Sequence, residues 1–525
     1  ALAGEKRFFH WELEFPEAFQ GENRGFDVVI GNPPYDILIR SEQGSDLISY
    51  VNTKYYAAEY NPNLFAIFTE LSIDLAKING FVSLIVPSMW LTNSKYTNMR
   101  SILLNNTQLR TILDLQFTVF KEIIPTSIYV AAKIVCQEDE LVKIGINKKD
   151  RGMLPSKYIE ITQSRLKSKL QDGFGDFISD EPNILKESLL SDLNNYYIIY
   201  RGVETRDNGK YLSDEKRDEL DQPILNAIDV ERYGCEWSGL YVRFVPGELK
   251  SNADINMYRV SQKVLLRRTG DTLISCVDVN GYLVTKNLYL LIPKTNLSAH
   301  FLCVVLNSKL MNWERIRRTR DQGQAFAQLK GTDIASFPIR RISFTTPAPE
   351  RARLVAELQQ LYAGGKHDEI LAAVDSCLPK DGEGNFVAEL EKSDVVHDLL
   401  AFLAERMLEM NKEKQREIKG FLGWLEGYVG AKVEDLTPKT KLQSYYEHDY
   451  ESFLAVLKKN RKKLAIDPAR REPAETLRSE FESSLGKLLP LLERIERTDR
   501  LIDAVVYRLY ALTEEEIGIV RGETH

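Results

Sequence analysis

Blocks of apolar residues separated by turn residues dominate the first part of the chain. Residues 26–30 form an apolar run between Gly25 and Gly31, as expected of a buried parallel strand. Apolar residues at helical spacing over 64–75 predict a helix, and Ser94 is a plausible cap for a second helix that reaches residue 105. Further strands are predicted over 81–86, 109–115 and 127–136. This repeat of strand and helix predicts an α/β doubly wound sheet.

The pattern changes twice further along the chain. From about residue 145, short strands alternate with turn signals such as Asn208-Gly209 and Asn280-Gly281, which predicts an α+β region. After Pro347 and Pro349, long apolar stripes at helical spacing predict an α-helical region. We therefore predict three domains, over residues 1–145, 146–345 and 346–525.

Length and composition agree with a globular protein. The chain has 525 residues, of which 43% are hydrophobic and 28% charged, and its mean hydropathy is -0.29. No apolar run is long enough to cross a membrane and the first residues do not resemble a signal peptide, so we predict a cytoplasmic protein without a membrane partner. The five cysteines are scattered, and their spacing supports neither a disulfide framework nor a metal site. Because the chain begins with Ala1, we expect it to be a piece of a longer protein.

Charge is distributed unevenly. The formal net charge is -7, yet residues 256–341 carry 14 Lys and Arg against 5 Asp and Glu, whereas residues 350–525 carry 27 against 34. A local basic surface is what binding to a nucleic-acid backbone requires. The alternative is an ordinary solvated face. The run 458–463, Lys-Lys-Asn-Arg-Lys-Lys, leaves the same two interpretations open.

Residues 31–35, Gly-Asn-Pro-Pro-Tyr, follow the first predicted strand directly. The carboxyl end of a strand in an open α/β sheet is where ligands bind. Asn32 offers a side-chain carbonyl, Pro33 and Pro34 hold a rigid turn without donors, and Tyr35 offers an aromatic face. Two acceptors on the hydrogens of a planar amino group would favour a pyramidal nitrogen and release its lone pair for attack on a methyl donor. Such a reaction needs no metal.

Asn32-Pro33-Pro34-Tyr35 resembles the catalytic motif of N6-adenine DNA methyltransferases, and the preceding residues 9–16 resemble the lead-in of type IIG restriction-modification enzymes. Phe120, followed by residues 126–128, is similar to the later motif whose aromatic residue contacts a flipped base. The resemblance implies a partial doubly wound methyltransferase sheet, S-adenosylmethionine as cofactor and double-stranded DNA as substrate. It also implies methylation of adenine N6 in a prokaryotic restriction-modification or phage-defence system.

Segments of the second region, among them 200–205, 263–268, 281–287 and 328–330, are similar to the TaqI-like target-recognition domain. Arginine can fork onto guanine or bind phosphate, so the arginine-rich positions in and near these segments are candidates for DNA contact. The candidates are Arg201, Arg267, Arg268, Lys286, Arg315, Arg317, Arg318, Arg320 and Lys330.

The glycine-rich loop that binds S-adenosylmethionine in this family is not found, either before Asn32 or convincingly after it. We therefore expect the chain alone to be inactive, with the cofactor loop, and in some relatives a nuclease domain, in a further N-terminal part or another chain. Asn32 and Pro33 are expected to border the cofactor site. One alternative is a non-catalytic DNA-binding specificity module. Another is a protein glutamine methyltransferase, which shares the Asn-Pro-Pro-Tyr pocket but has little need for a long basic region.

Overall fold

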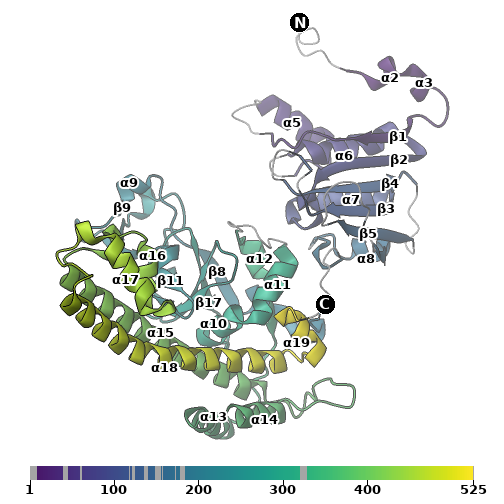
Figure 1. The fold of residues 1–525 in the computed structure, drawn as a ribbon. Helices are drawn as coiled ribbons and strands as arrows, with labels where there is room; N and C mark the ends of the chain where they lie inside the picture. The colour runs from purple at the N-terminus through teal and green to yellow at the C-terminus, as the bar shows by residue number, and fades with distance from the viewer. Residues whose placement is uncertain are drawn as a thin grey trace. The chain divides into compact units, whose positions relative to one another are not determined.

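The computed structural model describes residues 9–38, 45–59, 62–117, 119–120, 124–134, 140–147, 155, 158–171, 173–177, 184–319 and 328–523. The chain divides into two compact units, Ala1–Asn183 and Ile184–His525 (Figure 1).

The first unit is built on a six-stranded mixed sheet with the order β1-β2-β4-β3-β5-β6. β1 is parallel to β2, β4 runs antiparallel between β2 and β3, and β5 is parallel to β3. The strands are β1 Phe26–Gly31, β2 Ala76–Pro87, β3 Gln108–Leu115, β4 Thr126–Ala132, β5 Leu141–Asn147 and β6 Tyr158–Thr162. The predicted boundary at residue 145 thus falls inside β5, and the first unit continues to Asn183.

The helices of this unit cover one face of the sheet. The predicted helix over 64–75 is α6, which begins where the Asn63 side chain accepts a hydrogen bond from the backbone of Phe65. Val82 and Leu84 of β2 point into one core with residues of α6, α7 and α8, so these three helices share a face. A doubly wound sheet has helices on both faces, whereas the described helices cover only one face of this sheet. The helices are α2 Trp11–Glu14, α3 Pro16–Phe19, α5 Ser45–Lys54, α6 Leu64–Leu75, α7 Thr97–Asn106 and α8 Gln163–Lys167.

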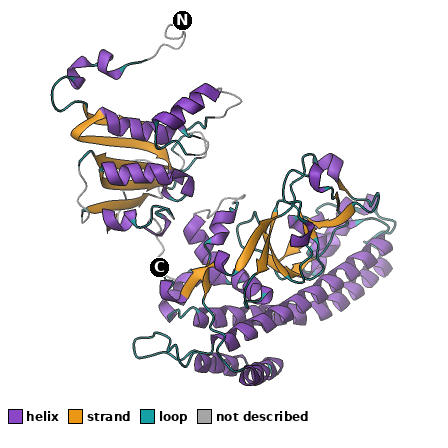
Figure 2. Cartoon of the chain, turned by 180° about the vertical axis from the view of Figure 1, so that it is seen from behind, coloured by secondary structure: helices purple, strands orange, loops and turns teal. Residues whose placement is uncertain are grey.

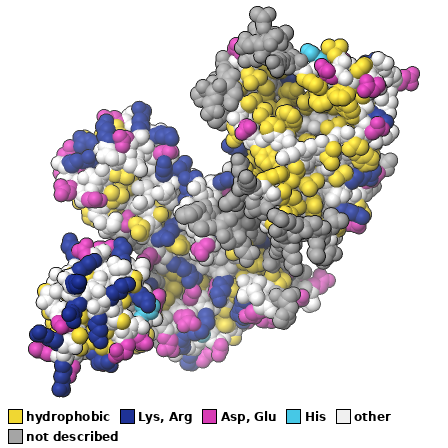
Figure 3. All heavy atoms as spheres, turned by 45° about the horizontal axis from the view of Figure 1, so that its top comes forward, with side chains coloured by type: hydrophobic (Ala, Val, Ile, Leu, Met, Phe, Trp, Pro, Cys, Tyr) yellow, Lys and Arg dark blue, Asp and Glu magenta, His cyan; other side chains and the backbone are white. Residues whose placement is uncertain are grey.

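Apolar side chains on the opposite face remain open to solvent. Val28 and Phe81 are register partners on β1 and β2 and project together from this face. Val28 is 54% exposed, Ile30 78% and Phe81 43%. The space-filling view shows hydrophobic side chains gathered on this unit (Figure 3). Val28, Ile30 and Phe81 are named the open face below.

The second unit combines strands and helices around shared cores. Two four-stranded sheets have the orders β16-β10-β13-β9 and β15-β14-β17-β8. Leu265 of β14 packs into the core between the sheets, while Val264 and Leu266 pack against helices. The strands are β7 Leu190–Asp192, β8 Tyr197–Arg201, β9 Leu212–Ser213, β10 Asp221–Leu225, β11 Val230–Glu231, β12 Gly234–Cys235, β13 Tyr241–Arg243, β14 Lys263–Arg267, β15 Ser275–Asp278, β16 Leu283–Val284, β17 Leu288–Pro293 and β18 Pro338–Arg340.

Two long helices, α15 and α18, run side by side along this unit (Figure 2). The predicted apolar stripes, which include Leu399 and Leu403 on α15 and Val505 and Leu509 on α18, are buried in a core that also contains α10. The predicted boundary at residue 345 therefore lies inside one packed unit. Its helices are α9 Asn208–Tyr211, α10 Ala299–Asn307, α11 Lys309–Thr319, α12 Gly331–Ala335, α13 Ala348–Ala363, α14 His367–Cys377, α15 Ser393–Val429, α16 Lys439–Gln443, α17 Tyr450–Lys459, α18 Arg471–Leu509 and α19 Glu514–Arg521.

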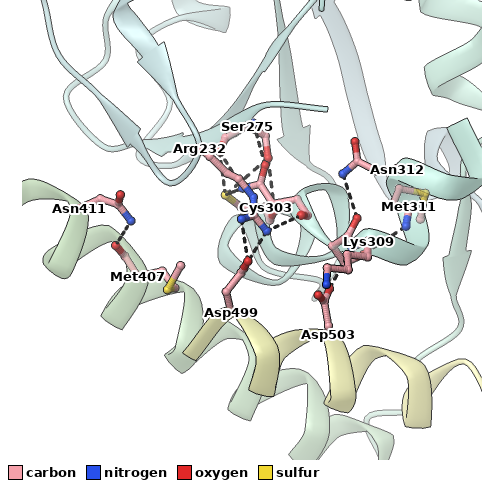
Figure 4. Close-up of polar contacts among 12 residues, drawn as sticks. Arg232, Ser275, Cys303, Lys309, Met311, Asn312, Met407, Asn411, Asp499 and Asp503 are labelled. Atoms are coloured by element: carbon pink, nitrogen blue, oxygen red, sulfur yellow. Dashed lines mark hydrogen bonds and ion pairs between the residues drawn. The ribbon is translucent and has the colours of Figure 1, made fainter. Parts of the chain in front are cut away.

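A polar anchor fastens α18 to the strand-rich part of this unit (Figure 4). Both terminal nitrogens of Arg232 donate to the Asp499 carboxylate at 2.7 Å, and one also donates to the Asn307 carbonyl. One turn further, Asp503 accepts a hydrogen bond from the backbone nitrogen of Lys309 at 2.9 Å. Burial raises the pKa of Asp503 to about 6.

In the described part of the chain, no helix is both long and apolar enough to cross a bilayer.

The Asp503→Asn variant is expected to be more stable than the wild type above pH 6. The raised pKa of Asp503 means that the folded state disfavours the charged carboxylate, so stability falls as the pH rises from about 4 to 6. The amide can still accept from Lys309 without that cost, which should stabilise the protein by about 2 kcal/mol. Denaturant unfolding at pH 7.5 and pH 4.5 measures this difference. Asp499→Asn, which breaks the Arg232 pair, should instead destabilise at pH 7.5, and equal stability of Asp503→Asn and wild type there would contradict the assignment.

Candidate active site

Three strand ends and one strand start meet at the same edge of the first sheet. β1, β2 and β3 run in the same direction, so their carboxyl ends share an edge, and the antiparallel β4 begins there. The register places Thr126, the first residue of β4, opposite both Pro87 and Leu115. Residues that follow β1, β2 and β3 are therefore brought together although they are far apart in sequence.

The turn after β1 presents polar atoms above a buried proline. Asn32 and Pro34 are exposed, whereas Pro33 is buried. Tyr35 is half-buried, and its hydroxyl donates to the Ile85 carbonyl of β2 at 3.2 Å. Burial raises the pKa of the Tyr35 phenol above its ordinary value.

Tyr35 and Phe120 lie beside each other at this edge. Their ring centroids are 6.5 Å apart and the rings are inclined by 71°, an edge-to-face arrangement. Phe65 of α6 supports Tyr35 from another side at 6.4 Å, while Phe120 is 39% exposed. The structure thus brings together the two aromatic residues that the sequence singled out for base stacking.

Sequence reasoning missed a polar group beneath this edge. Ser88, directly after β2, donates through its hydroxyl to the buried Asp114 of β3 at 2.8 Å, and its backbone nitrogen donates to the Pro125 carbonyl. Gln116 donates to the other Asp114 oxygen at 3.2 Å. These bonds tie the ends of β2 and β3 to the segment before β4. The available signal was a carboxylate inside an otherwise apolar strand.

The hydroxyl of Thr126 is buried and has no hydrogen-bond partner among the described residues. Within the described ranges, no cluster of three or more His, Cys, Asp or Glu residues could hold a metal ion. The chemical resources of this edge are therefore acceptors, an unpaired hydroxyl and aromatic faces.

Five of the predicted DNA contacts gather at one end of the sheet β15-β14-β17-β8. Arg201 ends β8, Arg267 ends β14, and Lys286 precedes β17, whose neighbours in the sheet are these two strands. Arg201 donates to the Lys286 carbonyl at 3.2 Å, and the Arg268 carbonyl accepts from Leu329, next to the exposed Lys330. The name basic sheet end is used below for Arg201, Arg267, Arg268, Lys286 and Lys330.

The basic sheet end is only partly neutralised. Glu204 accepts hydrogen bonds from Lys250 at 3.0 Å and from Lys286 at 3.3 Å, and these bonds, the Lys250 bond first, hold the pKa of Glu204 below its ordinary value. The Nε atoms of Arg267 and Arg268 are buried without a hydrogen-bond partner among the described residues. The surplus positive charge suits an anionic ligand.

Two arginines of the predicted cluster on α11 are buried inside the fold. Arg315 is 2% exposed and donates to the backbone carbonyls of Asp271 and Gly270. Arg317 is 3% exposed and forms a two-pronged ion pair with the buried Glu314. These two predicted contacts are wrong.

Arg318 donates to the same Glu314 carboxylate and to the Ser336 carbonyl. Helical spacing of three and four residues explains why Arg317 and Arg318 converge on one carboxylate. Arg320 lies outside the described residues.

Three segments of the chain match three different protein families. Residues 1–120 match the Eco57I restriction-modification methylase family, residues 222–339 the TaqI-like C-terminal specificity domain, and residues 393–506 a domain of unknown function, DUF8810. A protein of Methanocaldococcus jannaschii, named as a candidate type II restriction enzyme and methyltransferase, RM.MjaORFECS2P, is 28% identical over 328 residues. That match covers 58% of this chain and 26% of the relative, so the chain spans about a quarter of the relative's length.

Solved structures that resemble the chain include two restriction enzymes. The type IIG restriction endonuclease BpuSI aligns at 14% identity with a TM-score of 0.30, over 72% of this chain and 54% of its own. The type IIL restriction-modification enzyme MmeI, solved in complex with DNA, aligns at 10% identity with a TM-score of 0.39, over 71% of this chain and 53% of its own.

Arg317→Ala is expected to destabilise the second unit by about 3 kcal/mol, because it removes one partner of a buried ion pair and leaves Glu314 with reduced compensation. Arg268→Ala, at the basic sheet end, should change the unfolding free energy by less than about 1 kcal/mol because its side chain is partly exposed. Denaturant unfolding of the two variants tests this distinction. Wild-type stability of Arg317→Ala would contradict the structural role.

Proposed function

We propose that this chain, which carries a methylase region and a TaqI-like specificity region of a restriction-modification system, supplies the base pocket and the DNA-reading surface of an adenine-N6 methyltransferase. The observation that carries the proposal is the pair of aromatic rings, Tyr35 and Phe120, beside the acceptors of Asn32 and Pro33.

A planar amine is a poor nucleophile because its lone pair is delocalised into the ring. In the proposed complex, the Asn32 side-chain oxygen and the Pro33 carbonyl accept the two hydrogens of the adenine amino group. Acceptors fixed in this way favour a pyramidal nitrogen and localise its lone pair. The buried Pro33 keeps its own carbonyl in place, since it lies in a rigid turn after a paired strand.

Tyr35 and Phe120 would hold the base after it leaves the duplex. Stacking on an aromatic side chain is worth about 1–3 kcal/mol per base, against a cost of a few kcal/mol for unpairing and unstacking. The Tyr35 hydroxyl is occupied by Ile85, so the ring is already oriented before a base arrives. Phe120 has the exposed surface needed to meet it.

When bound, S-adenosylmethionine supplies an electrophilic methyl group. The acceptors at Asn32 and Pro33 fit the amine that would receive it. A glycine-rich turn after an apolar strand, suited to hold the cofactor itself, is not identified in the ranges that the structure describes. We propose that another segment or chain supplies that part and packs on the open face, and that this chain alone binds DNA without transferring a methyl group.

The basic sheet end is the proposed contact with double-stranded DNA. Arg267 and Arg268 add positive charge to this end of the sheet, and the side chains of Lys286 and Lys330 are accessible for phosphate. A non-catalytic specificity module is the second candidate function, favoured by the uncovered sheet face. The two functions differ in whether methylation in the host requires Asn32.

Changing the Asn32 codon to Ala in the native host should abolish N6-methyladenine at one sequence motif, because one of the two amine acceptors is lost. Single-molecule sequencing of host DNA detects the modified base and its motif directly. Asn105→Ala, a surface asparagine whose amide donates to Ser101 within α7, is the matched control and should leave methylation intact. Undiminished methylation in the Asn32→Ala strain would contradict the assignment. Absence of N6-methyladenine from host DNA in both wild type and variant would favour the specificity module.

Replacing Val28, Ile30 and Phe81 together by Ser should lower binding of an apolar fluorescent dye without lowering the melting temperature, because these side chains are exposed on one face. The matched control replaces Ile228, Leu390 and Leu489, which are exposed but distant in sequence from one another. Dye titration and thermal unfolding measure both effects. Equal dye loss in the two triple variants would argue against a distinct apolar docking face.

A further inference from the structure

The helices α15 and α18 form a small body with its own core at the end of the pair where α15 finishes and α18 begins. Residues from the last part of α15, the first part of α18 and the intervening α16 and α17 share one apolar cluster, which includes Phe421, Leu457 and Phe481. This body lies within residues 393–506, the segment that matches a domain of unknown function. Its chemistry is not used in the function proposed above.

A basic turn projects from this body where α17 ends. Lys458 and Lys459 close α17, and Arg461, Lys462 and Lys463 follow in a single helical turn. All five side chains are exposed. The name basic turn is kept for these five residues.

Hydrogen bonds from Asn460, Lys463 and Ala465 fix the backbone of the basic turn. Asn460, between the two halves of the turn, is buried. Its side-chain amide donates to the Thr437 carbonyl at 2.9 Å, and its side-chain oxygen accepts from the Thr437 backbone nitrogen at 3.1 Å. Lys463 donates to the Asp435 carbonyl at 2.6 Å. Just after it, Ala465 donates to the Val429 carbonyl at the end of α15. The cations are therefore presented from a fixed backbone, which lowers the entropic cost of meeting a ligand.

The basic turn differs from an ordinary solvated helix face in its lack of counter-charges. Among the described residues, Lys458, Lys459 and Lys462 have no ion pair, and Arg461 has one at 4.0 Å. Several exposed arginines on the long helices do pair with glutamates three or four residues away, as in Arg406–Glu409, Arg478–Glu482 and Arg500–Glu496.

The small body is attached to the strand-rich region that carries the basic sheet end. Lys419 of α15 forms an ion pair with Glu236, and Gln415 donates to Glu231 of β11 at 2.6 Å. The flanking apolar residue Leu457 is buried, so the turn offers charge without an apolar surface to insert into a lipid layer. These features favour a polyanion held by the same unit.

We propose that the basic turn is a second, sequence-independent contact with the phosphate backbone of DNA. The identity of the ligand rests on the proposed function, in which this unit holds duplex DNA. Each cation that neutralises a phosphate steepens the logarithmic dependence of affinity on salt by about 0.9. Engagement of two or more of the five cations would therefore contribute at least about 2 to that slope.

The test compares the full chain with a variant in which Lys458, Lys459, Arg461 and Lys462 are all changed to Gln. Lys463 is kept because it bonds to the backbone. The matched control changes four exposed cations elsewhere on α15 and α18, namely Lys412, Arg416, Arg494 and Arg500. Binding of a fluorescent duplex of random sequence is measured by anisotropy over a range of salt concentrations, with melting temperature as the check on folding.

The proposal predicts that the turn variant binds at least about 10-fold more weakly near physiological salt, with a salt slope lower by about 2 or more, while the control stays within about 2-fold. Equal binding by wild type and turn variant would overturn the proposal but leave the proposed function standing. Equal losses in variant and control would overturn it as well, since net charge alone would then explain the effect. If the wild type binds no duplex at any salt concentration, both this proposal and the proposed function fail. If the turn variant loses binding to phosphatidylserine vesicles while its DNA binding is unchanged, the basic turn is assigned to membranes instead.

Discussion

The antiparallel placement of β4 between β2 and β3 is the constraint on which the candidate site depends. Because β4 starts at the edge where its neighbours end, the connection from β3 to β4 stays at that edge and holds Phe120 near Tyr35. The Ser88–Asp114 bond and the Tyr35–Ile85 bond fasten the same edge from below. A wholly parallel arrangement would carry the chain to the opposite edge before the next strand began. The proximity of Tyr35 and Phe120 is thus a consequence of strand order more than of any single side chain.

The sequence predicted those elements whose formation depends mainly on residues close together in the chain. A helix is present where the apolar spacing predicted one, with Asn63 as its cap, and the turn at Asn32 follows its strand as expected. The extent of the sheet was missed, since β5 and β6 are held by pairing with distant residues rather than by a strong pattern of their own. The roles of Arg315 and Arg317 were missed for a related reason. Their partners lie inside the fold, and a run of arginines carries no mark of burial.

The second unit packs its strands and its long helices into one body. The Arg232–Asp499 pair and the shared apolar core fix α18 against the strands, while the far end of the same helix pair carries the basic turn. The first unit has the opposite character, with apolar side chains left exposed on one face of its sheet. These features are what the proposed function uses: charge on the second unit for DNA, and exposed apolar side chains on the first unit for a further polypeptide.

In the proposed function, Tyr35 and Phe120 receive an adenine taken out of the duplex. The most direct measurement compares the affinity of this chain for two duplexes that contain the adenine methylated in the host. In one duplex thymine lies opposite that adenine, and in the other the opposite position is abasic. Removing the pairing partner lowers the cost of extraction by up to a few kcal/mol, so the account predicts at least about 10-fold tighter binding to the abasic duplex. It also predicts that Tyr35→Ala and Phe120→Ala lose most of that gain. Equal affinity of the wild type for the two duplexes would contradict the account.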